Sequence, residues 1–155
     1  MATRGPGLFL PARPISFTVK DAAQGGDANA ESWLGVYLKA QHHYKQGLVW
    51  LQKAADQNNA GGEFSLGNAY ANGQGVPQNY AKAVYWYQKA AEQGNARAEY
   101  NLGIAYYHGQ GVPQNSIIAI RWFEKAAEQF EKAAEQGEQS AAERAIQIIE
   151  KGNAG

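Results

Sequence analysis

Residues 59–93 read NAGGEFSLGNAYANGQGVPQNYAKAVYWYQKAAEQ, and residues 95–129 repeat this pattern as NARAEYNLGIAYYHGQGVPQNSIIAIRWFEKAAEQ. Of the 35 aligned positions 21 are identical, including the strings GQGVPQN and KAAEQ. A repeat of this size is typical of helical arrays in which each unit buries its apolar side chains only against its neighbours. The sequence therefore predicts an all-α solenoid built from antiparallel helix pairs.

Short polar residues mark the start of the first helix in each pair. Asp27, Asn59 and Asn95 precede alanine-rich segments and can accept hydrogen bonds from the free amides of a helix start. Gly73 and Gly109 suit the left-handed caps at the ends of such helices. The predicted first helices span residues 28–40, 60–72 and 96–108, and the predicted second helices span 44–57, 80–93 and 116 onward. These pairs divide the chain into repeats at about 27–58, 59–94 and 95–137.

The two ends of the chain differ from the repeats. Residues 1–19 contain three prolines and no helical period, which predicts an extended or disordered segment, with a short strand over 15–19 as the alternative. The single helical domain then covers residues 20–155. Residues 138–151 are predicted to form a final helix that caps the stack, because one helical stripe collects the apolar residues Ala141, Ala142, Ala145, Ile148 and Ile149.

The string FEKAAEQ occurs twice in succession, at 123–129 and 130–136. Neither copy contains a helix breaker, so one uninterrupted helix is predicted from 116 to 136. Seven residues add about 10.5 Å of helix but only about 20° of rotation. The final helix must therefore start about two turns late, and when it folds back it leaves part of the usual contact site uncovered. That strip can recruit a second copy of the chain, which predicts a homodimer through the lengthened helix.

Composition excludes several classes of function. Lysine plus arginine equals aspartate plus glutamate, 14 against 14, so no nucleic-acid partner is expected. The absence of cysteine excludes disulfides and thiolate chemistry. No apolar run reaches the roughly 20 residues of a membrane helix, so we expect a soluble chain without membrane insertion. The apolar patch at 8–10 is too short for a signal peptide, which leaves a cytoplasmic protein or a fragment of a periplasmic or secreted parent as alternatives.

The polar motifs do not match known catalytic or metal sites. GQGVPQN lacks the lysine and Ser/Thr of a phosphate-binding loop and is interpreted as a turn. No metal-ligand spacing relates the three histidines His42, His43 and His108. Glu31, Glu63 and Glu99 recur near the helix starts, where a carboxylate favours the helix dipole. Successive repeats hold them about 10 Å apart, so paired-carboxylate catalysis is not expected. The sequence predicts no catalytic residue, no metal and no cofactor.

Glycine in the middle of the first helices calls for a structural reason, because it costs about 1 kcal/mol relative to alanine. Gly67 and Gly103 follow Leu66 and Leu102 in the repeats. We expect the second helix of each pair to approach closely there, through Trp86 or Trp122 or through an alanine pair.

The pattern AxxxLGxxYxxGxGVPQNYxKAxxWYxKAAEQGN resembles the bacterial-type Sel-one-like repeat (SLR) family, a branch of the tetratricopeptide-like repeats, over about residues 26–137. The resemblance implies antiparallel helix pairs in a right-handed superhelix that serves as an adaptor surface for a protein or peptide. Some secreted relatives carry one disulfide per repeat, and penicillin-binding or β-lactamase activity is attributed to that subgroup. This chain, without cysteine, departs from it.

Positions i, i+4, i+7 and i+11 share one side of a helix, and on the first helices this side varies between otherwise matching repeats. In such a superhelix it would line the concave groove. The predicted partner-binding residues are Trp33, Val36, Ser65, Asn68, Asn72, Arg97, Asn101, Ile104 and His108. The predicted function is a non-enzymatic protein–protein interaction module. The alternatives are a peptidoglycan-active or β-lactamase-like hydrolase, and an immunity or regulatory protein for one dedicated partner.

Overall fold

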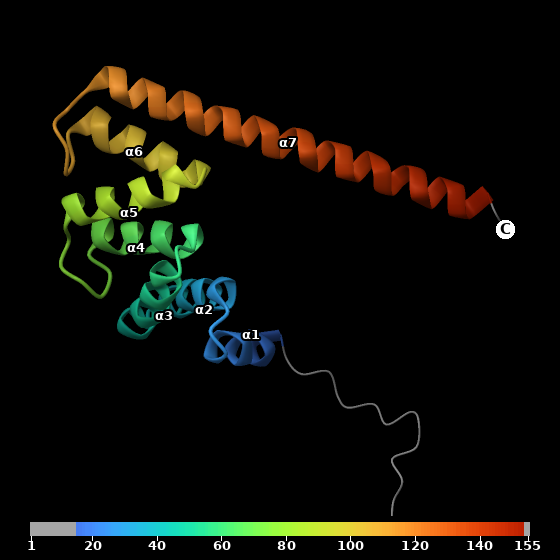
Figure 1. Ribbon diagram of the computed structural model, residues 1–155, viewed down its shortest axis with the longest axis horizontal. Coiled ribbons are helices and arrows are strands. Elements are labelled where there is room, and N and C mark those ends of the chain that lie inside the picture. The colour runs from blue at the N-terminus through green and yellow to red at the C-terminus, as the bar shows by residue number, and fades with distance from the viewer. Residues whose placement is uncertain (1–14, 154–155) are drawn as a thin grey trace, which may run out of the picture.

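The computed structural model describes residues 15–153, apart from the side chains of residues 15–17, 138, 141, 142, 144, 145, 148, 149, 152 and 153. It consists of helices stacked in chain order (Figure 1), and residues 15–153 contain no strand. The helices are α1 (Ile15–Gln24), α2 (Ala28–Ala40), α3 (Tyr44–Asp56), α4 (Ala60–Asn72), α5 (Tyr80–Glu92), α6 (Ala96–His108) and α7 (Ser116–Asn153). The pairs α2/α3, α4/α5 and α6/α7 form the repeats, which confirms the predicted all-α solenoid.

The predicted caps set the bounds of the first helices. The side chains of Asp27, Asn59 and Asn95 each accept a hydrogen bond from the backbone amide three residues later, at 2.8, 2.9 and 2.9 Å. At the other end, Gly73 and Gly109 adopt φ angles of 64° and 68°, in the left-handed region that glycine enters without steric cost. The bounds of α2, α4 and α6 therefore agree with those predicted.

The string GQGVPQN joins the two helices of a repeat and also touches the repeat before it. Gln78 Nε2 donates to the carbonyl of Ala71 at 2.8 Å, which satisfies a free group at the end of α4. Asn79 Oδ1 accepts from the backbone amide of Lys82 at 3.0 Å and caps α5. A Cβ on Gly75 would lie 2.9 Å from Cδ1 of Leu48 in the preceding repeat. The loop thus supplies caps within a repeat and a contact between repeats.

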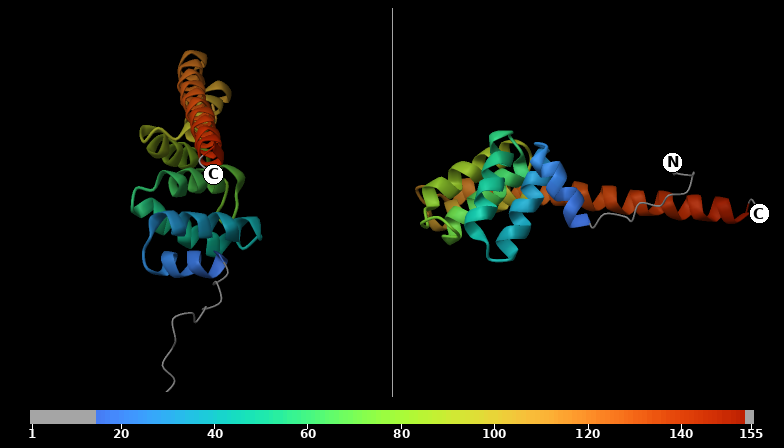
Figure 2. Two further views of the ribbon diagram at one scale, coloured as in Figure 1. Left: turned by 90° about the vertical axis from the view of Figure 1, so that its right-hand side faces the viewer. Right: turned by 90° about the horizontal axis from the view of Figure 1, so that it is seen from below.

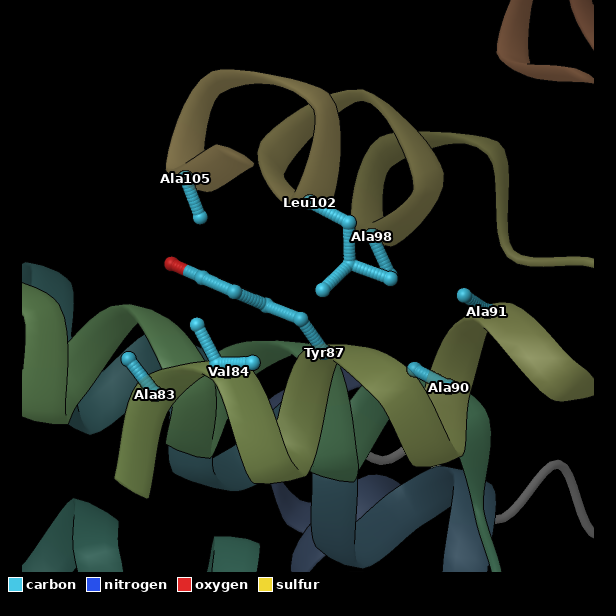
Figure 3. Packing of buried hydrophobic residues seen from close by; sticks show 8 residues of the cluster. All are labelled: Ala83, Val84, Tyr87, Ala90, Ala91, Ala98, Leu102 and Ala105. Carbon is cyan, nitrogen blue, oxygen red and sulfur yellow. The ribbon is translucent and has the colours of Figure 1, made fainter. Parts of the chain in front are cut away.

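Small residues allow the helices to pack closely. Figure 3 shows the cluster between α5 and α6, where the Tyr87 ring lies beneath Leu102 and its hydroxyl lies near Ala105. A Cβ on Gly67 would lie 2.5 Å from Cε1 of Tyr87, so the absence of a side chain there admits the ring. The expected close approach of the second helix is confirmed, but the two predicted occupants of this space, Trp86 or an alanine pair, are wrong.

The same correction applies one repeat later. A Cβ on Gly103 would lie 2.5 Å from Cε1 of Phe123, so Phe123 occupies the space that was predicted for Trp122. Trp86 instead packs against Leu51, Ala55 and Leu66, in the cluster that joins neighbouring repeats. Because successive helical residues point about 100° apart, the residue after each tryptophan faces its own first helix.

The chain before the first repeat includes a helix. Residues 15–19 were predicted as extended, with a strand as the alternative, and both predictions are wrong because these residues form the first half of α1. The remaining residues of the segment, 1–14, lie outside the described part of the chain. Ala23 of α1 is buried, and α1 packs on α2, so α1 occupies the place of a second helix from a preceding repeat.

The long helix α7 runs for 38 residues through both copies of FEKAAEQ, which confirms the predicted continuity from 116 to 136. The separate capping helix predicted over 138–151 is wrong, because these residues continue α7 away from the stack (Figure 2). A Cβ on Gly137 would have no atom within 4 Å. A lone glycine costs a helix only about 1 kcal/mol, and no packed neighbour favours a turn at this point.

In the first two repeats a buried glutamate connects the start of the first helix to the end of its partner. Glu31, Glu63 and Glu99 are 4%, 0% and 3% exposed. Gln57 Nε2 donates to Glu31 Oε2 at 2.8 Å, and Gln93 Nε2 donates to Glu63 Oε2 at 2.7 Å. Both glutamines are C-cap residues, which immediately follow the ends of α3 and α5. The glutamates were predicted only as partners of the helix dipole, and the structure adds this specific bond.

Candidate functional site

Three polar side chains from α4, α5 and α6 form a hydrogen-bond network. Asn68 Oδ1 accepts a hydrogen bond from the Tyr87 hydroxyl at 2.6 Å and another from Asn101 Nδ2 at 3.2 Å. Asn68 and Asn101 are half-buried, whereas Tyr87 is only 6% exposed. Within the described part of the chain, no group bonds to Asn68 Nδ2 or Asn101 Oδ1, so a donor and an acceptor remain available side by side.

This network lies in a groove of about 440 Å³, a volume within the range of about 300–1,000 Å³ that is typical of ligand sites. The lining residues carry no formal charge. They include the apolar side chains Val84, Ile104 and Ala105 and the polar side chains Asn72, Gln78 and Gln110, besides the network itself. The groove therefore offers neutral hydrogen-bonding groups beside an apolar wall.

Burial shifts the pKa of Tyr87, which lies in the groove, and that of Lys39, which does not line it. Burial raises the pKa of Tyr87 to about 12, an effect that the amide of Asn101 partly offsets. The hydroxyl thus stays protonated and donates its hydrogen bond throughout the ordinary pH range. On α2, burial lowers the pKa of Lys39, whose ammonium lies 3.4 Å from the carbonyl oxygen of Ser65.

The groove brings together four of the nine residues predicted for partner binding: Asn68, Asn72, Asn101 and Ile104. Arg97 lines a separate cavity of about 420 Å³ beside α7. The remaining four residues lie outside both cavities. A role for any of these nine residues in partner binding stays a prediction.

The outlying residues have distinct surroundings. Trp33 and Val36 are each 47% exposed on α2, and the Trp33 ring stacks on Tyr37 at 5.4 Å. His108 is exposed and meets the Tyr107 ring edge-on. Ser65 is only 7% exposed, so it presents little surface to a partner in this structure.

The sequence analysis missed Tyr87, Gln78 and Gln110 as residues of the groove. Tyr87 directly follows Trp86, the residue that was expected to pack on the mid-helix glycine, and the sequence analysis assigned Tyr87 no role. The next repeat has Phe123 at the same position, and this difference of one hydroxyl was the available signal. The two glutamines belong to GQGVPQN strings that are identical in both repeats, so variation between repeats could not reveal them.

Other kinds of site find no support in the described residues. Residues 15–153 hold no group of three or more histidine, aspartate or glutamate side chains placed to bind a metal ion. The same part of the chain contains no helix with the length and apolar character needed to cross a membrane.

Solved structures with the same architecture come from several bacteria. The protein c5321, a protective antigen present in uropathogenic Escherichia coli strains that displays an SLR fold, is 39% identical with a TM-score of 0.70. The match covers 76% of this chain but only 26% of that protein, so the present chain spans about a quarter of its length. No protein among those with curated functions matches the chain.

Two smaller proteins match over almost their whole lengths. A Sel1 repeat protein from Oxalobacter formigenes is 35% identical over 80% of this chain and 99% of its own, with a TM-score of 0.67. The cysteine-rich protein B (hcpB) of Helicobacter pylori is 27% identical over 77% of this chain and 93% of its own, with a TM-score of 0.62.

The family model for the Sel1 repeat matches residues 29–59, 60–95, 96–129 and 130–138. The first three matches agree with the three helix pairs of the fold, and the last falls on the second copy of FEKAAEQ and the residues that follow it. Sel1 repeat proteins are generally protein-interaction modules. With matches across most of its length and with helix pairs that follow the repeat boundaries, this chain belongs to the Sel1 repeat family.

Proposed function

We propose that this chain is a non-enzymatic protein-binding module whose groove on α4, α5 and α6 holds an extended segment of a partner protein. The observation that carries the proposal is the pair of available amide groups, Asn68 Nδ2 and Asn101 Oδ1, held next to each other by their shared hydrogen bond of 3.2 Å.

A free donor and a free acceptor are the two kinds of group that complement an extended backbone. Each residue of a partner presents one N–H donor and one C=O acceptor. Asn68 Nδ2 can donate to the carbonyl, and Asn101 Oδ1 can accept from the amide. Asn68 Oδ1 is occupied by the Tyr87 hydroxyl at 2.6 Å and by Asn101 Nδ2 at 3.2 Å, which hold the amide of Asn68 in place and leave its Nδ2 as the free group. The pair is therefore oriented before a partner binds, which reduces the entropic cost of binding.

The charge and polarity of the groove favour a neutral segment. None of its lining residues is Lys, Arg, Asp or Glu, so a charged side chain would lose hydration without gaining an ionic partner. Ile104, which is only half-buried, provides apolar surface for an aliphatic side chain next to the bonded backbone. Binding should then depend only weakly on salt, because screening acts on charge–charge attraction.

Selection from a library of random peptides, followed by titration of the winning peptide, tests this function. Asn101→Ala should weaken binding about ten-fold or more, because loss of one hydrogen bond in a desolvated site costs about 1–3 kcal/mol. Gln88→Ala, an exposed position on the same helix as Tyr87, is the matched control and should leave affinity unchanged.

Two results would contradict the proposal. One is selection of peptides that bind Asn101→Ala as tightly as the parent chain. The other is a set of strongly charged peptides whose affinity falls steeply with added salt, because such binding would use surface charge outside this groove.

A further inference from the structure

One face of α7 is exposed where the equivalent face of α5 is buried. Val84 and Ala91 of α5 pack in the cluster with α6 and are 7% and 5% exposed. Their equivalents 36 positions later are Ile120, which is 55% exposed, and Ala127, which is also exposed. The last repeat therefore ends in an apolar face that lacks the kind of helix that α6 provides for α5.

The far half of α7 carries the sequence pattern of such a helix. Residues 140–146 read SAAERAI, and residues 96–102 at the start of α6 read ARAEYNL. The alignment sets Glu143 on Glu99 and Ile146 on Leu102. At the position of Ile146, the first helices of the three repeats have Leu34, Leu66 and Leu102, which are 8%, 2% and 1% exposed. Ile146 is 55% exposed, so this segment has the residue that a first helix buries but no neighbour that buries it.

The duplicated heptad prevents this segment from covering the exposed face of its own chain in register. In the second repeat, α5 ends at Glu92 and is followed by Gln93 and Gly94. The next helix, α6, begins at Ala96 and folds back along α5. In the third repeat, the second copy of FEKAAEQ places seven additional residues between Gln129 and Gly137. These residues add about 10.5 Å of helix. A helix that folded back after Gly137 would start two turns too far away and would leave Ile120 uncovered.

A segment from another copy of the chain has no such restriction. We infer that residues 139–149 of one copy dock on the Ile120–Ala127 face of a second copy, and that the exchange is reciprocal. Both contact surfaces lie on α7, so two α7 helices would pair antiparallel, in the relative orientation of α5 and α6. The formal net charge of zero removes long-range repulsion between the copies. The partner on this surface is a second copy, and the surface is separate from the groove on α4, α5 and α6.

The mass of the protein in solution is the first test. Light scattering coupled to gel filtration should give twice the chain mass of 16.8 kDa at high concentration, with dissociation on dilution. Ile146→Glu should weaken the dimer at least ten-fold, because it places a charge where an apolar side chain is buried. Gln147→Glu adds the same charge at the next exposed residue and should leave dimerisation unchanged. A monomer at every concentration would overturn the inference.

Cross-linking distinguishes exchange from folding back, and the chain contains no natural cysteine to interfere. A mixture of an Ile120→Cys chain with an Ile146→Cys chain should form a covalent dimer of the two under mild oxidation. Replacing the second chain with Gln147→Cys should greatly reduce that product. No enrichment over this control would contradict the exchange. A double variant, Ile120→Cys with Ile146→Cys, that oxidises only within a single chain would show that the segment folds back instead.

Discussion

Gln93 donates a hydrogen bond of 2.7 Å to the buried carboxylate of Glu63, whereas Gln129, at the equivalent position of the next repeat, makes no such bond to Glu99. Gln93 is the C-cap residue immediately after α5, so its side chain can turn back toward α4. Gln129 lies inside α7, which continues to Asn153. In the described structure one oxygen of each carboxylate, Glu63 Oε1 and Glu99 Oε2, is buried without a hydrogen-bond partner, but only Glu63 receives a glutamine bond on its other oxygen.

Removal of the glutamine bond should destabilise the second repeat but not the third. Gln93→Ala leaves Glu63 without a hydrogen-bond donor, and a buried group left unsatisfied costs about 1–3 kcal/mol. Gln129→Ala is the matched control and should change the free energy of unfolding by less than about 0.5 kcal/mol. Urea denaturation followed by circular dichroism measures both. Equal losses in the two variants would contradict the assigned role of Gln93.

Glu99 should make stability depend on pH. Burial raises its pKa above the ordinary value of 4.5, so the folded state binds a proton more readily than the unfolded state. The stability that the protonated carboxyl of Glu99 contributes is fully present below pH 4.5. It is lost as the pH rises through the raised pKa of the folded state. Glu99→Gln, which is neutral at every pH, should therefore melt at a higher temperature than the parent chain at pH 7.

The difference between Glu99→Gln and the parent chain should shrink as the pH falls toward 4. Glu124→Gln removes an exposed carboxylate from α7 and serves as the control, with little change at either pH. Thermal melts at pH 4, 5.5 and 7 give the comparison. A Glu99→Gln variant that is less stable than the parent at pH 7 would show that the ionised carboxylate is favourable.

The mid-helix glycine of α4 should resist substitution. In Gly67→Ala the new Cβ would lie 2.5 and 2.6 Å from Cε1 and Cδ1 of the Tyr87 ring and 3.2 Å from the carbonyl oxygen of Ala83. Overpacking of this kind costs about 1–3 kcal/mol, which exceeds the gain in helix propensity of about 1 kcal/mol. Chemical denaturation should show a net loss, and a gain in stability would contradict the close packing of α4 on α5.

The glycine of α7 should behave in the opposite way. Gly137→Ala meets no atom within 4 Å, and alanine is favoured over glycine in a helix interior by about 1 kcal/mol. Helicity measured by circular dichroism should stay equal or rise, and stability should not fall. A loss of helicity would indicate a turn at Gly137 instead of a continuous helix.

Local signals in the sequence were sufficient to predict the repeated helices. Asp27, Asn59 and Asn95 mark helix starts, and Gly73 and Gly109 mark helix ends, because each satisfies backbone groups within a few residues of itself. The end of α7 could not be predicted in this way. Whether the chain turns at Gly137 depends on a neighbour that would favour the turn, and local sequence does not report that neighbour.

The groove was only partly predictable for a related reason. Asn68 and Asn101 stood out because their columns vary between repeats that otherwise match. Tyr87 did not, because its ring and its hydroxyl have different roles: the ring fills the space above Gly67, and the hydroxyl bonds to Asn68. A residue that serves both the core and a site is assigned to the core when only its repeat position is known.

The proposal that the Asn68–Tyr87–Asn101 network is the centre of peptide binding is tested most directly by nuclear magnetic resonance. The side-chain amide signals of Asn68 and Asn101 should shift progressively as a selected peptide is added, and the shifts should saturate with the same affinity as binding. The side-chain amide of Gln88, exposed on α5, should not move. Shifts confined to the Trp33 indole on α2 or to residues of α7, with both asparagine amides unchanged, would contradict the account.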